Sequence, residues 1–400
     1  MSTIVAGRLP VEADLERWRS ADRVARPQRL AALRARMAEE DVGAYFGVRR
    51  ENIRYLTGLE LGEGEEKVAG NSGQFLVGPS EVVVLADSRY TVQAAEQCPD
   101  ARLERVYNDF LERWPELLDS IGGPRRVAVE AGFVSHLTWG RLVAAASDVE
   151  LVAAENWVET QRQVKEPSEI ERVAAACAVA DAALERLQPT LRPGLTEAEV
   201  ALALEWEMRT NGAEALAFDV TCLAGPDAAL PHGSPGARRL AAGEVLLFDF
   251  GAQVCGYRSD MTRTLFVGEP TARDLEIYAI VQHAQEASKE AIEHAMAAWE
   301  RPSGRAIHQV SADVIAAAGH GDHYGHGLGH GIGLATHELP GLGLSAPDTP
   351  LPSPTVFTLE PGIYLDGVTG VRIEDTMWFD ADAGRLDRLS LFPREVTVVG

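Results

Sequence analysis

The chain has 400 residues, of which 46% are apolar and 24% are charged, and this composition excludes a disordered, collagen-like or coiled-coil protein. The length suits two domains better than a single core. The 60 acidic and 37 basic residues give a formal net charge of -23, which repels phosphate backbones and anionic lipid surfaces, so we expect no nucleic-acid partner and no membrane partner.

The amino-terminal residues do not match a secretion signal, because no apolar run of about 7 to 15 residues follows a basic start. No stretch of about 18 uninterrupted apolar residues occurs later in the chain. The four cysteines, Cys98, Cys177, Cys222 and Cys255, lie far apart without a C-x-x-C pair, which predicts reduced thiols in the core. We therefore expect a cytoplasmic protein.

Strand and helix patterns alternate through the first 160 residues, which predicts an α/β domain over 1–160. The predicted elements are a helix within 11–40, a strand at 43–48, two strands around a Gly-Pro turn within 73–87, a strand at 126–130, a helix over 135–146 and a strand at 149–154.

A second domain is predicted over 161–400. At 159–173 the apolar pattern lapses, and a long Ala-rich helix follows Pro167, a residue that suits a first helical turn. The predicted helices are 167–188, 196–211, 271–298 and 303–318, and the predicted strands are 216–223, 244–250, 262–267, 355–360 and 371–379. Two helix pairs beside two sets of strands suggest an internal duplication, although no convincing sequence repeat accompanies them.

The segment GHGLGHGIGL, residues 325–334, carries glycine at every odd position from 325 to 333. A helix here would contain five glycines at a cost of about 1 kcal/mol each, so we predict an extended or looped segment. Side chains two apart in an extended chain share a face, which predicts His326, Leu328, His330 and Ile332 on one side. Taken alone, the segment leaves a surface loop or an adventitious metal tract as the alternatives.

Four acidic residues lie in or beside apolar strand patterns: Asp249, Asp260, Glu360 and Glu374. A buried carboxylate costs several kcal/mol unless it is neutralised. For any one of them a salt bridge to an arginine such as Arg263 or Arg372 is an alternative. For all four together with His330, a shared cation is the better explanation.

Charge bookkeeping favours two divalent ions, because four carboxylates bring -4 and two such ions bring +4. Two ions that share carboxylates can activate water and polarise a carbonyl, which is the chemistry of amide hydrolysis. A ligand set of mostly oxygen with one nitrogen favours Mn(II) or Co(II), with Zn(II) possible.

The ordered set Asp249, Asp260, His330, Glu360 and Glu374, together with HGLGHGIGL and GVRIED, resembles the pita-bread metallopeptidases, in particular the Xaa-Pro peptidases. The resemblance runs from about Lys165 to the carboxyl end, and residues 1–158 resemble, more weakly, the creatinase-type amino-terminal domain of that family. It implies an α/β (α+β) chain with a creatinase-like first domain and a pita-bread catalytic domain. It also implies a homodimer.

The resemblance implies that Asp249 binds one metal, that Asp260 and Glu374 bridge both, and that His330 and Glu360 complete the second. Glu360 is also implied as the proton shuttle to the leaving prolyl nitrogen.

Four further residues match positions around the substrate. His232, His326 and His337 match substrate-side histidines of the family, with packing or a loop hydrogen bond as their alternative roles. Arg372 matches an arginine that orients the metal-bridging carboxylate.

His320 and His323 match no catalytic position, so we expect them to be structural.

The activity that this resemblance implies is an Xaa-Pro dipeptidase acting on a proline-containing dipeptide or short peptide. Prolidases commonly place an arginine before the first glutamate ligand to clamp the free carboxylate of the dipeptide, but residues 341–356 contain no basic residue. His232, an arginine of the first domain or one from a partner subunit could replace it. The alternatives are an Xaa-Pro aminopeptidase on longer peptides, a non-peptidase hydrolase or lyase on this fold, and a non-enzymatic binding module.

Overall fold

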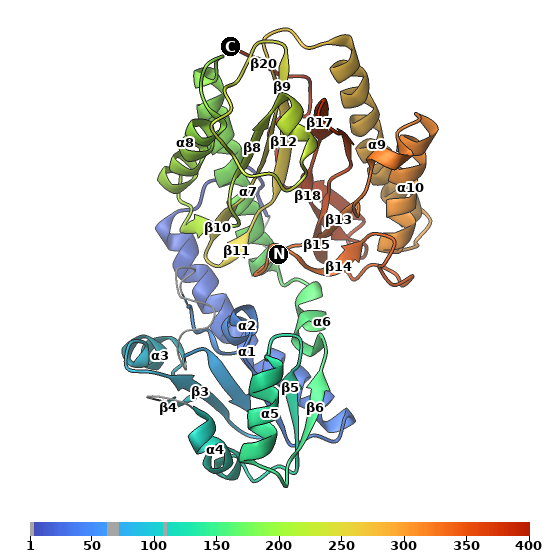
Figure 1. Cartoon of the computed structure of the whole chain (residues 1–400). Helices are drawn as coiled ribbons and strands as arrows, with labels where there is room; N and C mark the ends of the chain where they lie inside the picture. The colour runs from blue at the N-terminus through green and yellow to red at the C-terminus, as the bar shows by residue number, and fades with distance from the viewer. Residues whose placement is uncertain (1–3, 62–71, 107–109) are drawn as a thin grey trace. The chain divides into compact units, whose positions relative to one another are not determined.

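A computed structural model describes residues 4–61, 72–106 and 110–400. The chain divides into two compact units, one of residues 19–161 and the other of residues 1–18 with 162–400 (Figure 1). Helix α1, Glu12–Glu39, belongs to both units, and helix α6, Trp157–Gln163, contains the second division. The predicted domains 1–160 and 161–400 stay a prediction.

The smaller unit is built on one mixed sheet with the strand order β4-β3-β2-β1-β5-β6. Phe46 of its central strand packs against Phe110 and Trp114 in the core, with Phe46 and Trp114 ring centroids 5.0 Å apart. The strands are β1 (Ala44–Gly47), β2 (Gln74–Val77), β3 (Val82–Ala86), β4 (Arg102–Arg105), β5 (Arg126–Glu130) and β6 (Glu150–Ala154), and the helices are α2 (Arg50–Thr57), α3 (Thr91–Gln97), α4 (Trp114–Ser120) and α5 (His136–Ala145). The predicted α/β fold of this part is confirmed.

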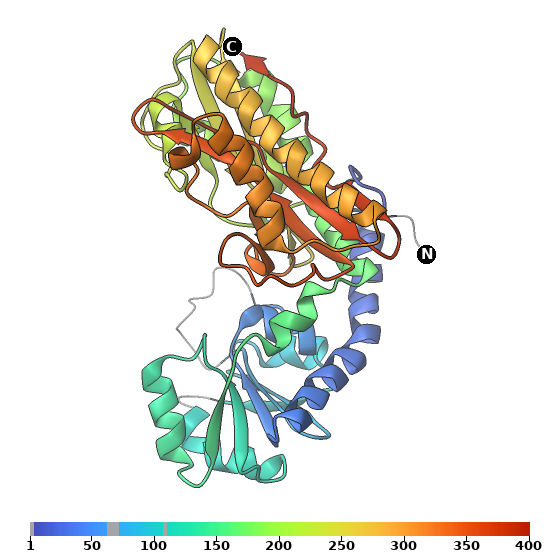
Figure 2. The same cartoon turned by 90° about the vertical axis from the view of Figure 1, so that its right-hand side faces the viewer.

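The larger unit packs two helix pairs against its sheets, α7 with α8 and α9 with α10, and Figure 2 shows α9 and α10 side by side. Three of these helices begin with a hydroxyl side-chain cap, which satisfies a free amide: Thr196 before α8, Thr271 before α9 and Ser303 before α10. The helices are α7 (Pro167–Leu187), α8 (Glu197–Thr210), α9 (Ala272–Ala297) and α10 (Gly304–Ala317). All four predicted helices are confirmed to within one or two residues at either end.

Two sheets of the larger unit, with the orders β20-β12-β9-β8 and β14-β13-β15-β18-β19, carry the predicted ligands, and short strands complete the unit. The strands are β7 (Ala215–Leu216), β8 (Thr221–Ala224), β9 (Glu244–Phe250), β10 (Ala252–Val254), β11 (Tyr257–Arg258), β12 (Met261–Val267), β13 (Gly329–Gly331), β14 (Glu338–Leu342), β15 (Thr355–Leu359), β16 (Gly362–Leu365), β17 (Thr369–Arg372), β18 (Asp375–Asp380), β19 (Arg385–Arg388) and β20 (Val398–Val399).

Strand β9 is buried on both faces. Leu246 and Phe248 pack with helices α7 and α8, while Val245 and Leu247 pack with α9. Asp249 follows in the same strand, with Thr221 and Thr262 opposite it on the neighbouring strands. The carboxylate therefore sits at the end of a strand that has no solvent face.

Two of the predicted strands are interrupted. The strand predicted at 216–223 is broken into β7 and β8, because residues 218–220 leave the sheet to line a cavity. The strand predicted at 371–379 is broken after Arg372, where the amide of Glu374 bonds the carbonyl of Thr262 at 3.1 Å instead of continuing the hairpin. The chain changes sheets at Glu374.

The glycine-rich segment is extended over Gly329–Gly331 and looped on either side, as predicted, and close backbone contacts require two of its glycines. A Cβ atom on Gly329 would lie 2.0 Å from the carbonyl oxygen of Thr358, and one on Gly331 would lie 2.2 Å from that of Leu339. The predicted common face is wrong, however. Leu328 packs in the core with Ile292 and Ile307, since the strand is short and its register shifts after His330.

The four cysteines are buried and free, as predicted. Within the described ranges, every helix is too short or too polar to span a lipid bilayer.

Replacing Gly329 with alanine should destabilise the fold by about 1–3 kcal/mol, because the added methyl overlaps the Thr358 carbonyl. Calorimetric unfolding measures the loss. Gly325→Ala is the matched control, since a Cβ there meets no atom within 4 Å. Equal melting temperatures for the two variants would contradict the packing described.

Candidate metal centre

A cavity of about 750 Å³ in the larger unit is lined by all of the residues that the sequence nominates for the site. They are Asp249, Asp260, His330, Glu360 and Glu374 among the predicted ligands, and His232, His326, His337 and Arg372 among the predicted substrate-side and orienting residues. Segments separated by more than a hundred residues thus meet at one place. His320 and His323 are outside this lining, and their rings pack edge to face with centroids 5.7 Å apart.

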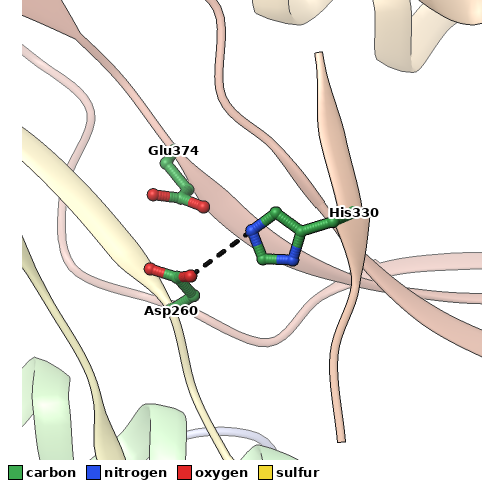
Figure 3. A group of neighbouring side chains, drawn as sticks. All are labelled: Asp260, His330 and Glu374. Atoms are coloured by element: carbon green, nitrogen blue, oxygen red, sulfur yellow. Dashed lines mark ion pairs between the residues drawn. The ribbon is translucent and has the colours of Figure 1, made fainter. Parts of the chain in front are cut away.

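The tightest group in the cavity is formed by Asp260, His330 and Glu374, each of which offers one ligand atom within 4.8 Å of the others (Figure 3). His330 Nε2 lies 3.5 Å from Asp260 Oδ2 and 3.4 Å from Glu360 Oε1. Asp249 lines the same cavity from β9. The four acids and the imidazole converge from five different strands or strand ends.

The imidazole of His330 presents a lone pair to these carboxylates. Its Nδ1 lies 3.1 Å from the carbonyl oxygen of Gly331, and a carbonyl can only accept, so Nδ1 carries the proton and Nε2 is the free acceptor. Burial lowers the pKa of His330 to about 4, which keeps the ring neutral near pH 7. An unprotonated nitrogen and carboxylate oxygens are all electron-pair donors, so they repel one another unless a cation lies between them.

Three buried carboxylate oxygens have no hydrogen-bond partner among the described residues: Asp249 Oδ1, Asp260 Oδ1 and Glu374 Oε1. A contrasting case is Glu130 in the smaller unit, whose buried carboxylate accepts from Tyr45, Asn52 and the amides of Val48 and Arg49. Buried polar atoms are nearly always paired. Hard divalent metal ions prefer oxygen ligands, so these three unpaired carboxylate oxygens fit such ions.

Crowding of the acids raises their pKa values. Burial and the charges of Glu374 and Asp249 raise the pKa of Asp260 well above its usual range, and burial with the charge of Glu360 does the same for Glu374. Burial raises the pKa of Glu360 to about 8, against the lowering influence of Arg372. A cation bound among these groups would therefore displace protons from them.

Arg372 connects the acids to one another. Its Nη2 donates to Asp249 Oδ2 at 2.5 Å and its Nε donates to Thr262 Oγ1 at 2.8 Å, while that hydroxyl donates to Glu374 Oε2 at 2.8 Å. The arginine thus contacts Asp249 directly and Glu374 through Thr262. The alternative of an arginine salt bridge holds for Asp249 alone, since Arg263 pairs with Asp375 at 2.6 Å.

His326 has both ring nitrogens engaged. Nδ1 lies 2.8 Å from the Gly327 carbonyl oxygen, and Nε2 lies 3.1 Å from the hydroxyl of Tyr364, which itself accepts from Arg372 Nη1 at 2.8 Å. The Tyr364 hydroxyl therefore donates to His326. Neither Tyr364 nor Thr262 carries a sequence signal, because a tyrosine or threonine in a strand is ordinary.

His337 is the freer histidine of the site. Its ring packs 4.2 Å from that of His330, its pKa is lowered by burial, and among the described residues it makes no hydrogen bond. The exposed His232 likewise makes none there. These two rings are available to a ligand in the cavity.

The residue after His337 anchors the turn that carries it. Glu338 is buried and forms ion pairs with Arg162 and with Lys165 Nζ, the latter at 2.5 Å. These cations, against the effect of burial, lower the pKa of Glu338 to about 2. A Cβ on Gly333 would lie 2.5 Å from Glu338 Oε1, so the last glycine of the motif makes room for this ion pair. Sequence reasoning missed it, since Glu338 lies in no apolar run.

Comparisons with known proteins find relatives over nearly the whole chain. Residues 171–381 match the model of metallopeptidase family M24, and residues 29–164 match the creatinase/prolidase N-terminal domain. The Xaa-Pro dipeptidase of Pyrococcus furiosus is 31% identical over 370 residues, covering 92% of this chain and 99% of that protein.

Solved structures are similar over nearly the whole chain. The Xaa-Pro dipeptidase from Bacillus anthracis superposes with a TM-score of 0.83 at 30% identity, covering 93% of this chain and 99% of that one. The X-Pro aminopeptidase from Thermotoga maritima superposes with a TM-score of 0.80 at 31% identity, covering 92% and 99%. The predicted pita-bread fold is confirmed.

Chelation of all metal should lower the melting temperature by several degrees, because ions at 100 times their dissociation constant stabilise a fold by about 2.7 kcal/mol. Adding Mn(II) back should restore it and release protons into a weakly buffered solution, since the acids hold protons when no cation is bound. Differential scanning calorimetry and a pH electrode measure both effects. An Asp260→Asn variant should respond much less to Mn(II), and an unchanged melting temperature after exhaustive chelation of the wild type would contradict the site.

Proposed function

The chain belongs to metallopeptidase family M24, and we propose that it hydrolyses the Xaa-Pro peptide bond, with dipeptides as its first substrates. The observation that carries the proposal is the convergence of four carboxylates and a neutral imidazole on one cavity, three of their oxygens being buried without a partner. Relatives named Xaa-Pro dipeptidase support the substrate.

In this proposal Asp249 would hold one divalent ion, Asp260 and Glu374 would be shared by two, and His330 with Glu360 would complete the second. Mn(II) or Co(II) suits the oxygen-rich set best, with Zn(II) as the alternative. When bound, such a pair of ions supplies Lewis acidity for the scissile carbonyl and lowers the pKa of water.

Glu360 is the proposed proton carrier. The nitrogen of an Xaa-Pro bond has no hydrogen, and it leaves as a secondary amine only after a proton reaches it. Glu360 accepts the proton of the attacking water on a carboxylate oxygen and passes it to the prolyl nitrogen. Thr358 Oγ1 donates to Glu360 Oε1 at 3.3 Å, which holds one oxygen and leaves the other for the transfer.

The three remaining histidines of the cavity have different proposed roles. His337 and His232 have free ring nitrogens in the cavity, so they are the proposed donors to the substrate carbonyl and carboxylate. His326 remains a predicted substrate-side residue, but its nitrogens are bonded to Gly327 and Tyr364. We therefore assign it to hold the Tyr364 hydroxyl, and through it Arg372, in place.

The main alternative is an Xaa-Pro aminopeptidase that acts on longer peptides. One observation favours it. Among the lining residues that the structure describes, Arg372 is the only lysine or arginine, and its donors are taken by Asp249, Thr262 and Tyr364. Segment 341–356 contains no basic residue either. The free carboxylate of a dipeptide would then depend on His232 as its partner in this cavity. The predictions of a homodimer and of a cytoplasmic location accompany either activity.

The Mn(II)-loaded protein should hydrolyse Ala-Pro, and Ala-Pro-Ala more slowly. Release of alanine, followed by chromatography, gives kcat/KM for both peptides. Cleavage of the tripeptide alone would favour the aminopeptidase alternative, and cleavage of neither would contradict the proposal.

Arg372→Lys should lower kcat/KM and metal affinity by about 10- to 100-fold, because lysine keeps the charge but cannot bond Asp249, Thr262 and Tyr364 together. Steady-state kinetics and calorimetric Mn(II) titration check it. Arg385→Lys, at an arginine that is 40% exposed, is the control. If Arg372→Lys keeps the wild-type kcat/KM and Mn(II) affinity, the proposed positioning role of this arginine is wrong.

A further inference from the structure

The cavity holds one carboxylate that the metal centre does not use. Five acidic residues line it, and Asp249, Asp260, Glu360 and Glu374 are the proposed ligands. The fifth is Asp219, which is exposed at the cavity wall. Among the described residues it has no hydrogen bond and no ion pair, so its negative charge is unmatched.

Among the described residues that line the cavity, Arg372 is the one lysine or arginine, and it pairs with Asp249 and not with Asp219. The guanidinium of Arg372 is bonded to Asp249, and the ring nitrogens of His326 are bonded to Gly327 and Tyr364. A substrate group that carries its own positive charge complements Asp219 best.

Asp219 lies close to the reacting centre without being part of it. It stands two residues before Thr221, which pairs with Asp249 across β8 and β9. Two residues of extended chain span about 7 Å. Asp219 therefore lines the cavity from the segment that leads into β8, beside the strand that carries Asp249.

The surrounding wall suits a long side chain with a charged end. The neighbours Phe218 and Val220 and, nearby, Pro231 and Pro235 line the same cavity. The methylene stem of a lysine or arginine packs on such apolar surface while its charged end seeks a polar partner. A phenylalanine ring adds a favourable face for a cation.

We propose that Asp219 binds the cationic side chain of the residue before proline, so that Lys-Pro and Arg-Pro are preferred substrates. This inference rests on the proposed function. Acidic side chains at that position are disfavoured by repulsion from the same carboxylate.

Isosteric substrate pairs isolate the charge. Lys-Pro against norleucine-Pro, and Arg-Pro against citrulline-Pro, differ in little besides the positive charge. The Mn(II)-loaded wild type should show about a five- to tenfold higher kcat/KM for the charged member, mainly through KM, as for a partly screened charge pair. Raising the salt concentration should shrink the preference.

Asp219→Asn should abolish the preference while leaving kcat/KM for norleucine-Pro near the wild-type value. Asp366→Asn is the matched control, because it removes the same charge from an exposed acid that does not line the cavity, and it should keep the preference. Equal kcat/KM for the paired substrates in the wild type, or a preference that survives in Asp219→Asn, would overturn the inference. A KM that rises equally for charged and uncharged dipeptides would assign Asp219 to the α-ammonium group instead and also overturn it.

Failure of the proposed function is distinguishable from failure of this inference. If the metal-loaded protein hydrolyses none of these dipeptides, the proposed function is wrong, and calorimetric titration with Lys-Pro and norleucine-Pro still tests Asp219. Tighter binding of Lys-Pro that is lost in Asp219→Asn supports the subsite, and equal binding of the two overturns it.

Discussion

Four carboxylates that crowd one buried cavity are the constraint on which the larger unit depends. Burial and mutual repulsion both oppose their charge, as the raised pKa values of Asp260, Glu360 and Glu374 reflect. A fold tolerates such a cluster only if cations neutralise it or if it stays partly protonated. The chain brings these acids together from the ends or breaks of separate strands, where the backbone can turn a carboxylate inward.

The scaffold around the cluster holds the acids apart at fixed positions. Arg263 bonds the carbonyls of Thr262 and Glu374 and the carboxylate of Asp375. Gln285 of α9 donates to the carbonyls of Leu359 and Ile373, the residues immediately before the two glutamate ligands. The helices thus do more than cover the sheet, because one amide side chain ties together both strands that carry these ligands.

Much of the site was predictable because a charged residue inside an apolar run is conspicuous. Asp249 and Glu360 were predicted in this way, and the alternating glycines around His330 predicted a backbone without bulky side chains on one face. The break at Glu374 was not predictable, since the alternation of GVRIEDTMWF continues through it while the backbone changes partners. The prediction that Leu328 shares a face with His326 and His330 was wrong for a related reason. A three-residue strand with a register shift does not keep its side chains on a common face. Tyr364 and Glu338 act through contacts between distant segments, which local patterns do not contain.

The central claim is that Asp249, Asp260, His330, Glu360 and Glu374 hold two divalent ions. Anomalous diffraction from crystals of the Mn(II)-loaded protein tests it most directly. The account predicts two manganese peaks about 3.5–4 Å apart, with the carboxylates of Asp260 and Glu374 between them. A single peak, or peaks away from these five side chains, would contradict it.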